Sequence, residues 1–251
     1  MKKALRMMCL AALMVGMGMN AQAQFRHSIF LNGNLPMGDF TSSVDQNRAS
    51  LLNNTGLPLG YTQIGKDASL GFGLGYRASY RFDVGMGIVA PFAQADFFWN
   101  MIDGTLRGYY IDNDYVAPNY FNVPLLAGVS YLYDELWNDI TPYGEFGIGA
   151  DWLLITREGK GASANNGTLY YAYKSNFSFA WMIGAGAYFG RHVSAGIYYY
   201  GLGIHPIDYT NKTINTNTVA NAEVVYHQNV DNVKREKRNI GSLALRIGFH
   251  F

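Results

Sequence analysis

The C-terminal stretch Ile240-Gly-Ser-Leu-Ala-Leu-Arg-Ile-Gly-Phe-His-Phe251 alternates between two kinds of side chain. One face of an extended chain collects the apolar residues Leu243, Leu245, Ile247, Phe249 and Phe251. The other face collects Ser242, Ala244, Arg246, Gly248 and His250. A repeat of two residues predicts a β-strand with one apolar face and one small or polar face.

The same alternation recurs along the chain. It predicts seven further strands, near residues 25–34, 70–82, 86–99, 120–131, 145–154, 176–189 and 193–203. The segment 86–99 is the weakest, because its alternation changes phase near Pro91 and a proline inside a strand suggests a bulge. Eight strands in total are an even number, as in single-chain bacterial membrane barrels.

The predicted connections alternate in length. Short ones lie near 83–85, 132–140 and 190–192, and long ones near 35–67, 100–118, 155–175 and 204–239. Short turns at one end and long loops at the other are typical of an outer-membrane barrel with both termini in the periplasm. In the last long connection, Val224, Val225 and Tyr226 suggest a hairpin that continues the last two strands. The sequence therefore predicts an all-β protein, an eight-stranded antiparallel up-and-down transmembrane β-barrel.

The N-terminal residues have the pattern of a secretory leader. Lys2, Lys3 and Arg6 precede an apolar run over 7–19, and Ala21-Gln22-Ala23 follows as a small-residue cleavage motif. The pattern predicts a cleaved signal peptide over 1–23 and one barrel domain over 24–251. The only cysteine, Cys9, lies in this leader, so we expect no cysteine chemistry in the mature chain. The near-neutral charge of the mature chain gives no reason to expect a nucleic-acid partner.

Several charged residues fall on the small, polar faces of the predicted strands. They are Arg26, Arg77, Arg81, Glu145, Asp151 and Arg246, joined by Asp96 if the segment 86–99 shifts phase. An arginine facing lipid at the midplane costs roughly 2–4 kcal/mol, so we expect these side chains in the lumen. The lumen of eight strands is just wide enough for side chains to fill, so the charges should pair. We interpret them as an interior charge network that seals the barrel. A gated narrow channel and a catalytic role for Glu145 or Asp151 are the alternatives.

A basic run, Lys234-Arg235-Glu236-Lys237-Arg238, precedes the last strand. Lys234, Arg235, Lys237 and Arg238 either contact lipopolysaccharide phosphates by charge attraction or form a solvated loop edge. The five histidines are dispersed without the spacing of metal ligands, so we expect neither a metal nor a cofactor.

The chain resembles the small bacterial outer-membrane β-barrels of the OmpA/OmpX-like eight-stranded group. Tyr120-Phe-Asn-Val-Pro-Leu-Leu-Ala-Gly-Val-Ser-Tyr131 and Pro142-Tyr-Gly-Glu-Phe-Gly-Ile-Gly149 are similar to strands of outer membrane protein beta-barrel domains of the Bacteroidetes. The resemblance implies an outer-membrane location, in contact with lipid and lipopolysaccharide. It also implies that Phe249 and Phe251 form an assembly signal that the barrel-assembly machinery reads.

The fold does not fix the function within this group. We expect a non-enzymatic barrel whose long loops make structural or adhesive contacts, including contacts with a host or surface ligand. A narrow pore or transport-associated barrel is the first alternative. A lipid A-modifying enzyme is the second, and it would need a serine, a histidine and an acid together near the outer surface of the membrane. His205 lies near the predicted outer end of a strand, but no serine stands two residues away on the same face.

Overall fold

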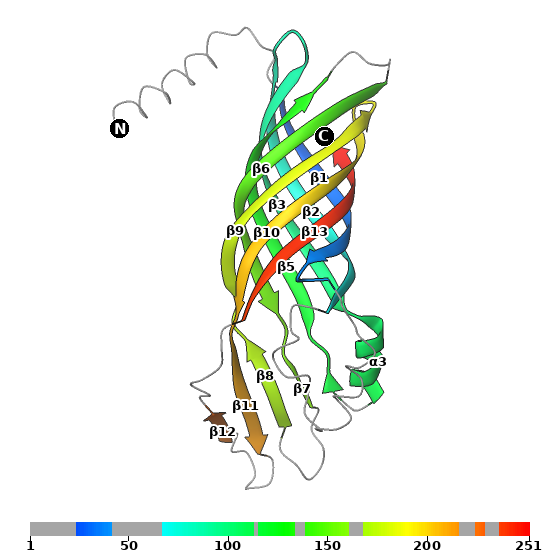
Figure 1. The fold of residues 1–251 in the computed structure, drawn as a ribbon. Coiled ribbons are helices and arrows are strands. Elements are labelled where there is room, and N and C mark those ends of the chain that lie inside the picture. The colour runs from blue at the N-terminus through cyan, green and yellow to red at the C-terminus, as the bar shows by residue number, and fades with distance from the viewer. Residues whose placement is uncertain are drawn as a thin grey trace, which may run out of the picture.

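The computed structural model describes residues 24–41, 67–112, 115–133, 139–160, 168–215, 224–228 and 236–251. Eight strands close into a barrel in which neighbouring strands are antiparallel, in the order β1-β13-β10-β9-β6-β5-β3-β2 (Figure 1). Their bounds are β1 (Gln24–Gly38), β2 (Ala68–Asp83), β3 (Ile88–Ile102), β5 (Asn119–Leu132), β6 (Ile140–Ile155), β9 (Asn176–Phe189), β10 (Val193–Ile207) and β13 (Glu236–His250). The predicted eight-stranded antiparallel barrel is confirmed. The predicted leader over 1–23 lies outside the described residues.

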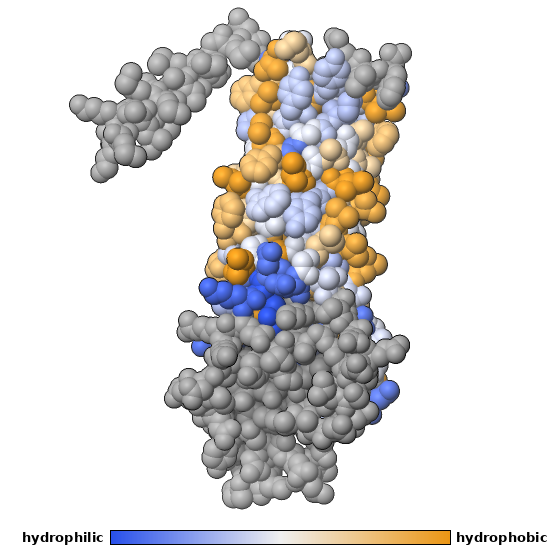
Figure 2. Space-filling view, in the orientation of Figure 1, coloured by the Kyte–Doolittle hydropathy of each residue, from blue (hydrophilic) through white to orange (hydrophobic). Residues whose placement is uncertain are grey.

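The barrel wall is apolar outside and small or polar inside. On β2, Leu70, Phe72 and Leu74 are exposed on the outer wall, whereas Gly71 and Gly73 face the lumen. Figure 2 shows orange apolar side chains spread along the wall of the barrel. A soluble barrel has the opposite polarity, with apolar side chains inside, so this arrangement is that of a transmembrane barrel.

The barrel closes where its first and last strands meet. The register of β1 and β13 runs from Ser28 opposite His250 to Gly38 opposite Ile240. At the end of this seam, the N–H of His27 donates to the carbonyl of Phe251 at 2.9 Å, and the N–H of Phe251 donates to the carbonyl of His27 at 3.0 Å. The C-terminal residue is therefore held in the wall by paired backbone hydrogen bonds.

Strand β3 differs from the prediction because it has no phase change at Pro91. Its pairing with β5 keeps one register from Ile88 opposite Leu132 to Met101 opposite Asn119. Pro91 is exposed on the outer wall, and the register irregularity of β3 against β2 lies near Ala68 instead. Two inward aromatic residues, Phe92 and Phe98, produce the apparent change of phase in the sequence. The predicted bulge is therefore wrong, and Asp96 faces the lumen without it.

Beyond the barrel, at the end with the long connections, the chain forms a second, five-stranded sheet (Figure 1). Its strands, in the order β12-β11-β8-β7-β4, are β4 (Tyr115–Val116), β7 (Glu158–Lys160), β8 (Thr168–Tyr173), β11 (Tyr209–Asn215) and β12 (Val224–Gln228). Helix α3 (Gly104–Asp112) lies at the same end of the barrel. The predicted hairpin corresponds to β11 and β12, but β12 pairs with β11 and does not extend β13. The other strands of this sheet, β4, β7 and β8, have only two, three and six residues, too few to show a clear alternation in the sequence.

Candidate functional site in the barrel lumen

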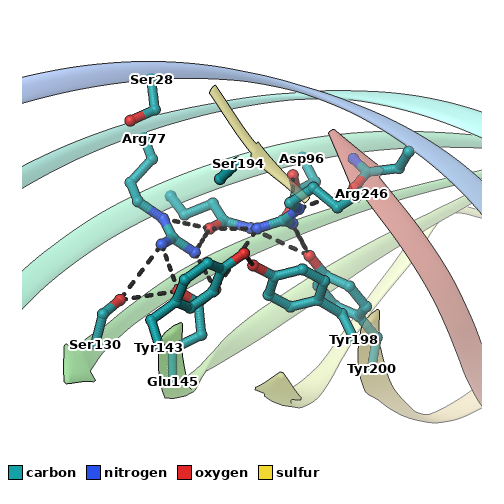
Figure 3. Close-up of polar contacts among 12 residues, drawn as sticks. Ser28, Arg77, Asp96, Ser130, Tyr143, Glu145, Ser194, Tyr198, Tyr200 and Arg246 are labelled. Atoms are coloured by element: carbon teal, nitrogen blue, oxygen red, sulfur yellow. Dashed lines mark hydrogen bonds and ion pairs between the residues drawn. The ribbon is translucent and has the colours of Figure 1, made fainter. Parts of the chain in front are cut away.

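Four charged side chains meet inside the barrel (Figure 3). Arg77 of β2, Asp96 of β3, Glu145 of β6 and Arg246 of β13 are all buried. Arg77 Nη2 lies 2.5 Å from Glu145 Oε1, and Arg246 Nη2 lies 3.3 Å from Asp96 Oδ1. Arg246 Nη1 also lies 3.7 Å from Glu145 Oε1, which joins the two pairs. The two guanidinium and two carboxylate groups balance in charge, as burial requires.

Gln94 of β3 links the two ion pairs through its side-chain amide. Its Oε1 accepts from Arg77 Nε at 2.8 Å and from Arg246 Nη1 at 3.3 Å. Its Nε2 donates to Asp96 Oδ2. Glu145 Oε2 accepts from Arg77 Nη1 at 2.6 Å and from Ser130 Oγ at 2.8 Å. Both Glu145 oxygens are therefore occupied by protein donors, which suits a structural role better than proton transfer.

Aromatic rings enclose the arginines. Arg77 Cζ lies 3.9 Å from the ring centroid of Phe92, and Arg246 Cζ lies 4.2 Å from that of Tyr198. Phe30 contacts both, at 5.0 Å from Arg77 Cζ and 4.3 Å from Arg246 Cζ. Such cation–π contacts replace part of the hydration that a guanidinium loses on burial.

Two tyrosine hydroxyls complete the hydrogen bonding of this cluster. Tyr200 accepts from Arg246 Nη2 and donates to Asp96 Oδ2 at 3.1 Å. The hydroxyls of Tyr143 and Tyr198 lie 2.5 Å apart. We call Arg77, Gln94, Asp96, Ser130, Tyr143, Glu145, Tyr198, Tyr200 and Arg246 the lumen network. Sequence reasoning missed its neutral members, although Gln94 alternates in phase with Asp96 on β3 and Tyr143 in phase with Glu145 on β6.

The other three charged residues of the predicted network lie elsewhere. Arg26 Nη1 donates to the carbonyl of Arg191 at 3.0 Å, in the turn between β9 and β10. Arg81 is half-buried, with its Cζ 4.9 Å from the ring centroid of Tyr188. Both therefore belong to the end of the barrel with the short turns, and the single predicted network of seven residues is wrong. Arg26 on β1 and Arg81 on β2 lie closer to the short turns than the lumen network does, and are therefore separate from it.

Asp151 forms a separate buried pair with His205. His205 Nε2 lies 3.2 Å from Asp151 Oδ2 and 2.9 Å from the carbonyl of Leu202, and its Nδ1 lies 2.6 Å from Asn176 Oδ1. A register shift in β10 between Gly201 and Gly203 changes which alternate residues face inward, and so brings His205 into the lumen. No serine hydroxyl bonds to His205 within the part of the chain that the structure describes.

Between the lumen network and the long connections, the lumen holds buried amides without a partner among the described residues. Within these residues, neither the oxygen nor the nitrogen of the Asn34 and Asn122 side chains has a hydrogen-bond partner, and the same is true of Ser242 Oγ. Buried polar groups of this kind normally bind water. This half of the lumen therefore mixes polar groups that suit bound water with buried apolar side chains such as Phe98 and Leu153.

Outside the barrel, a carboxylate of the second sheet is buried among tyrosines. Glu158 of β7 accepts from the hydroxyl of Tyr110 of α3, and from that of Tyr173 of β8 at 2.6 Å. Burial raises the pKa of Glu158 to about 7, the two tyrosine hydrogen bonds oppose this shift, and the nearby Asp67 adds to it. Glu158 thus joins helix α3 to the second sheet.

The remaining predicted site residues lie near the two ends of β13. Lys237 is exposed on the outer wall, whereas Arg238 is buried and points inward, so only Lys237 of this pair can meet lipid headgroups. Lys234 and Arg235 lie outside the described residues. Phe249 and Phe251 are exposed at the other end of the strand, where the outer wall is apolar.

Among the described residues, no group of three histidine, cysteine, aspartate or glutamate side chains could hold a metal ion. In the same residues, no helix is long and apolar enough to cross a membrane.

No protein-family model and no curated protein matches the chain. Among solved structures, it is similar to a major outer membrane protein from Thermus thermophilus, with 10% identity, 91% of this chain and 100% of that chain covered, and a TM-score of 0.44. It is also similar to Ail, the attachment invasion locus protein of Yersinia pestis, with 12% identity, coverage of 90% and 97%, and a TM-score of 0.39. For Neisserial surface protein A, the identity is 10%, the coverage 91% and 97%, and the TM-score 0.37.

Proposed function

We propose that the chain is an integral outer-membrane protein whose barrel is a closed anchor for the second sheet and helix α3. The observation that carries this proposal is the lumen network. Its ion pairs, between Arg77 and Glu145 and between Arg246 and Asp96, cross the lumen and are packed against Phe30, Phe92 and Tyr198. We therefore expect no continuous water path for ions through the lumen, and we place the working surface outside the barrel.

The outer wall supports the membrane location. Exposed apolar side chains such as Leu74, Leu125 and Leu245 cover it, and water alone would not stabilise so large an apolar surface. Aromatic side chains lie toward both ends of this belt. Trp99, Trp152 and Phe177 lie near the long connections, and Tyr131, Tyr133 and Phe189 near the short turns.

The lengths of the connections support an orientation. The start of β1, the end of β13 and the tight turn between β9 and β10 share one end of the barrel. In the proposed orientation this end is periplasmic, and the second sheet is outside the cell. The second sheet would make structural or adhesive contacts there, with a host or surface ligand. Lys237 would meet lipopolysaccharide, and Phe249 and Phe251 would be read by the barrel-assembly machinery.

Conductance in a planar bilayer tests the closed lumen. Residues 24–251 would be refolded, and folding would be verified by heat-modifiable mobility in gel electrophoresis. We expect no ionic current from the wild-type chain, and steps of current from a variant in which Arg77 and Arg246 are both replaced by alanine. The matched control replaces Arg107 of α3, which is exposed and outside the barrel. Steady current from the folded wild-type chain would contradict the closed anchor.

A narrow pore is the second candidate, and the unpartnered amides of Asn34 and Asn122 favour it. Water bound to these groups would lie in the half of the lumen that faces the long connections. In this alternative, the lumen network is the gate, and its ion pairs separate transiently. The same bilayer recording decides between the two candidates, because a gated pore shows brief openings without any mutation.

We also propose that the chain is not an enzyme. Both ring nitrogens of His205 contact Asp151, Asn176 or the carbonyl of Leu202, which leaves neither free to activate a serine. Mass spectra of lipid A from cells with and without the protein test this proposal. New or missing acyl chains that depend on His205 would contradict it.

A further inference from the structure

A groove of about 830 Å³ lies on the membrane-facing wall formed by β1, β9, β10 and β13. Small residues form its floor, among them Gly33, Ala187 and Ala195. Apolar side chains such as Ile197 and Leu245 stand at its sides and are exposed. Figure 2 faces this part of the wall, where a paler strip of surface runs between orange apolar side chains. The groove is therefore open to the hydrocarbon of the membrane and has room for a flexible apolar chain.

The strand register places the groove in the half of the wall near the short turns. Ala187 pairs with Ala195, and the next outward pair toward the turn is Phe189 with Val193. The turn that follows, Gly190-Arg191-His192, carries two exposed basic side chains. A flexible apolar molecule that lies in the groove and extends toward this end therefore passes Phe189 and Val193 and then reaches Arg191 and His192.

The contacts of this turn leave its polar groups available to an anion. Arg191 uses its backbone carbonyl to accept from Arg26, and no described residue binds its guanidinium group. His192 Nδ1 bonds to the carbonyl of His250 at 2.9 Å, which leaves Nε2 without a partner among the described residues. Asp139 lies beside the turn, because its carbonyl accepts from the N–H of Gly190 at 2.8 Å. The described residues show no ion pair between Asp139 and Arg191, while Arg26 adds a further positive charge nearby.

We propose that this surface is a phospholipid-binding site. The groove holds an acyl chain, and Arg191 and His192 bind the phosphate of the headgroup. The inference rests on the proposed membrane orientation, in which the short turns meet the phospholipid leaflet. A second copy of the chain fits less well. Two copies side by side in one membrane would place both Arg191 side chains at the same height, where their charges repel.

Titration of the refolded full chain with phosphatidylglycerol in detergent, followed by native mass spectrometry, tests the site. We expect one bound lipid per chain. Ala187→Phe fills the groove and should weaken binding about tenfold, equivalent to the loss of about two buried methylene groups. Arg191→Gln should weaken it about fivefold. Inorganic phosphate without an acyl chain should not bind.

The matched controls are Ala127→Phe, on the exposed wall of β5, and Arg107→Gln, on helix α3. Both should bind lipid like the wild type. Equal losses for Ala187→Phe and Ala127→Phe would show an unselective lipid annulus and overturn the site. If the wild-type chain forms a dimer and Ala187→Phe converts it to a monomer, that result would also overturn the lipid site, because the groove would then be a contact between two copies of the chain. Flotation with vesicles tests membrane insertion separately. If the Ala187→Phe variant floats with vesicles and still binds lipid as well as the wild type, that result contradicts only the site.

Discussion

At the scale of single residues, Arg246 shows how the barrel stabilises a charge in its lumen. It binds Asp96, Gln94 and Tyr200, and packs between the rings of Phe30 and Tyr198. A guanidinium at this depth is stable only because the carboxylate and the rings replace its hydration. Sequence alternation alone could place Arg246 in the lumen, since a charge facing lipid is excluded. It could not choose the partner, which depends on strand order around the barrel.

Replacing Arg246 with alanine should lower the free energy of unfolding by about 3–5 kcal/mol, because Asp96 then remains buried without its cation. The measurement is urea unfolding in micelles. Arg81→Ala is the matched control, since Arg81 is half-buried and contacts the ring of Tyr188. It should cost less than about 1 kcal/mol. Similar losses for the two variants would refute the importance of the central pairing.

Two glycines of the barrel wall, Gly75 and Gly33, should differ in how much stability is lost when each is replaced by alanine. A Cβ added at Gly75 would collide with Asp96 Oδ1, whereas a Cβ added at Gly33 would meet no atom within 4 Å. Gly75→Ala should therefore destabilise the barrel by about 1–3 kcal/mol, and Gly33→Ala should be neutral or slightly stabilising. Thermal unfolding followed by electrophoretic mobility measures both. An unchanged Gly75→Ala midpoint would mean that Asp96 can move away without loss.

At the scale of elements, alternation predicted most of the barrel strands because each has one lipid-facing side. It failed at Pro91 because the inward Phe92 and Phe98 look like outward residues in the sequence. It also missed that the β10 bulge near Gly203, whose φ is +93°, turns His205 inward. The short strands of the second sheet lack a lipid-facing side, so their sequences carry little alternation. Alternation in the sequence therefore predicts strands that contact the membrane better than it predicts strands outside the membrane.

The second sheet and helix α3 should respond to pH through Glu158. Its pKa is raised to about 7 from an ordinary value of 4.5. Below pH 4.5 the carboxyl is protonated whether folded or unfolded, and its stabilising effect is fully present. As pH rises from about 4.5 to 7, the unfolded state loses its proton first, so stability falls by up to about 3 kcal/mol. Limited proteolysis of the second sheet across this range measures the effect.

Glu158→Gln should remove this dependence on pH, because glutamine keeps a neutral group between Tyr110 and Tyr173. Asp112→Asn, at the exposed end of α3, is the control and should leave the dependence intact. A wild-type chain whose proteolysis is independent of pH between 4.5 and 7 would contradict this account of Glu158.

At the scale of the whole molecule, the barrel should fold without the outer part of the second sheet. Replacing residues 209–235 with a short glycine-serine turn removes β11 and β12 but keeps His205, Ile207 and Arg238, which are buried. We expect unchanged heat-modifiable mobility and a loss of any surface binding. A longer replacement, of 204–238, should fail to fold because it leaves Asp151 without His205. Equal folding of both variants would show that this pair is dispensable.

The seam between β1 and β13 also constrains how the protein is made. Strand β1 has its partner in β13, and Phe251 is part of the seam. No closed wall can form before β13 has been synthesised, so closure of the barrel must follow synthesis of this strand. Until then, every strand near the seam offers unpaired backbone groups and an apolar face to its surroundings. The unclosed chain must therefore be shielded from aggregation until β13 is in place, and a variant without β13 would keep β1 and β10 as open edges.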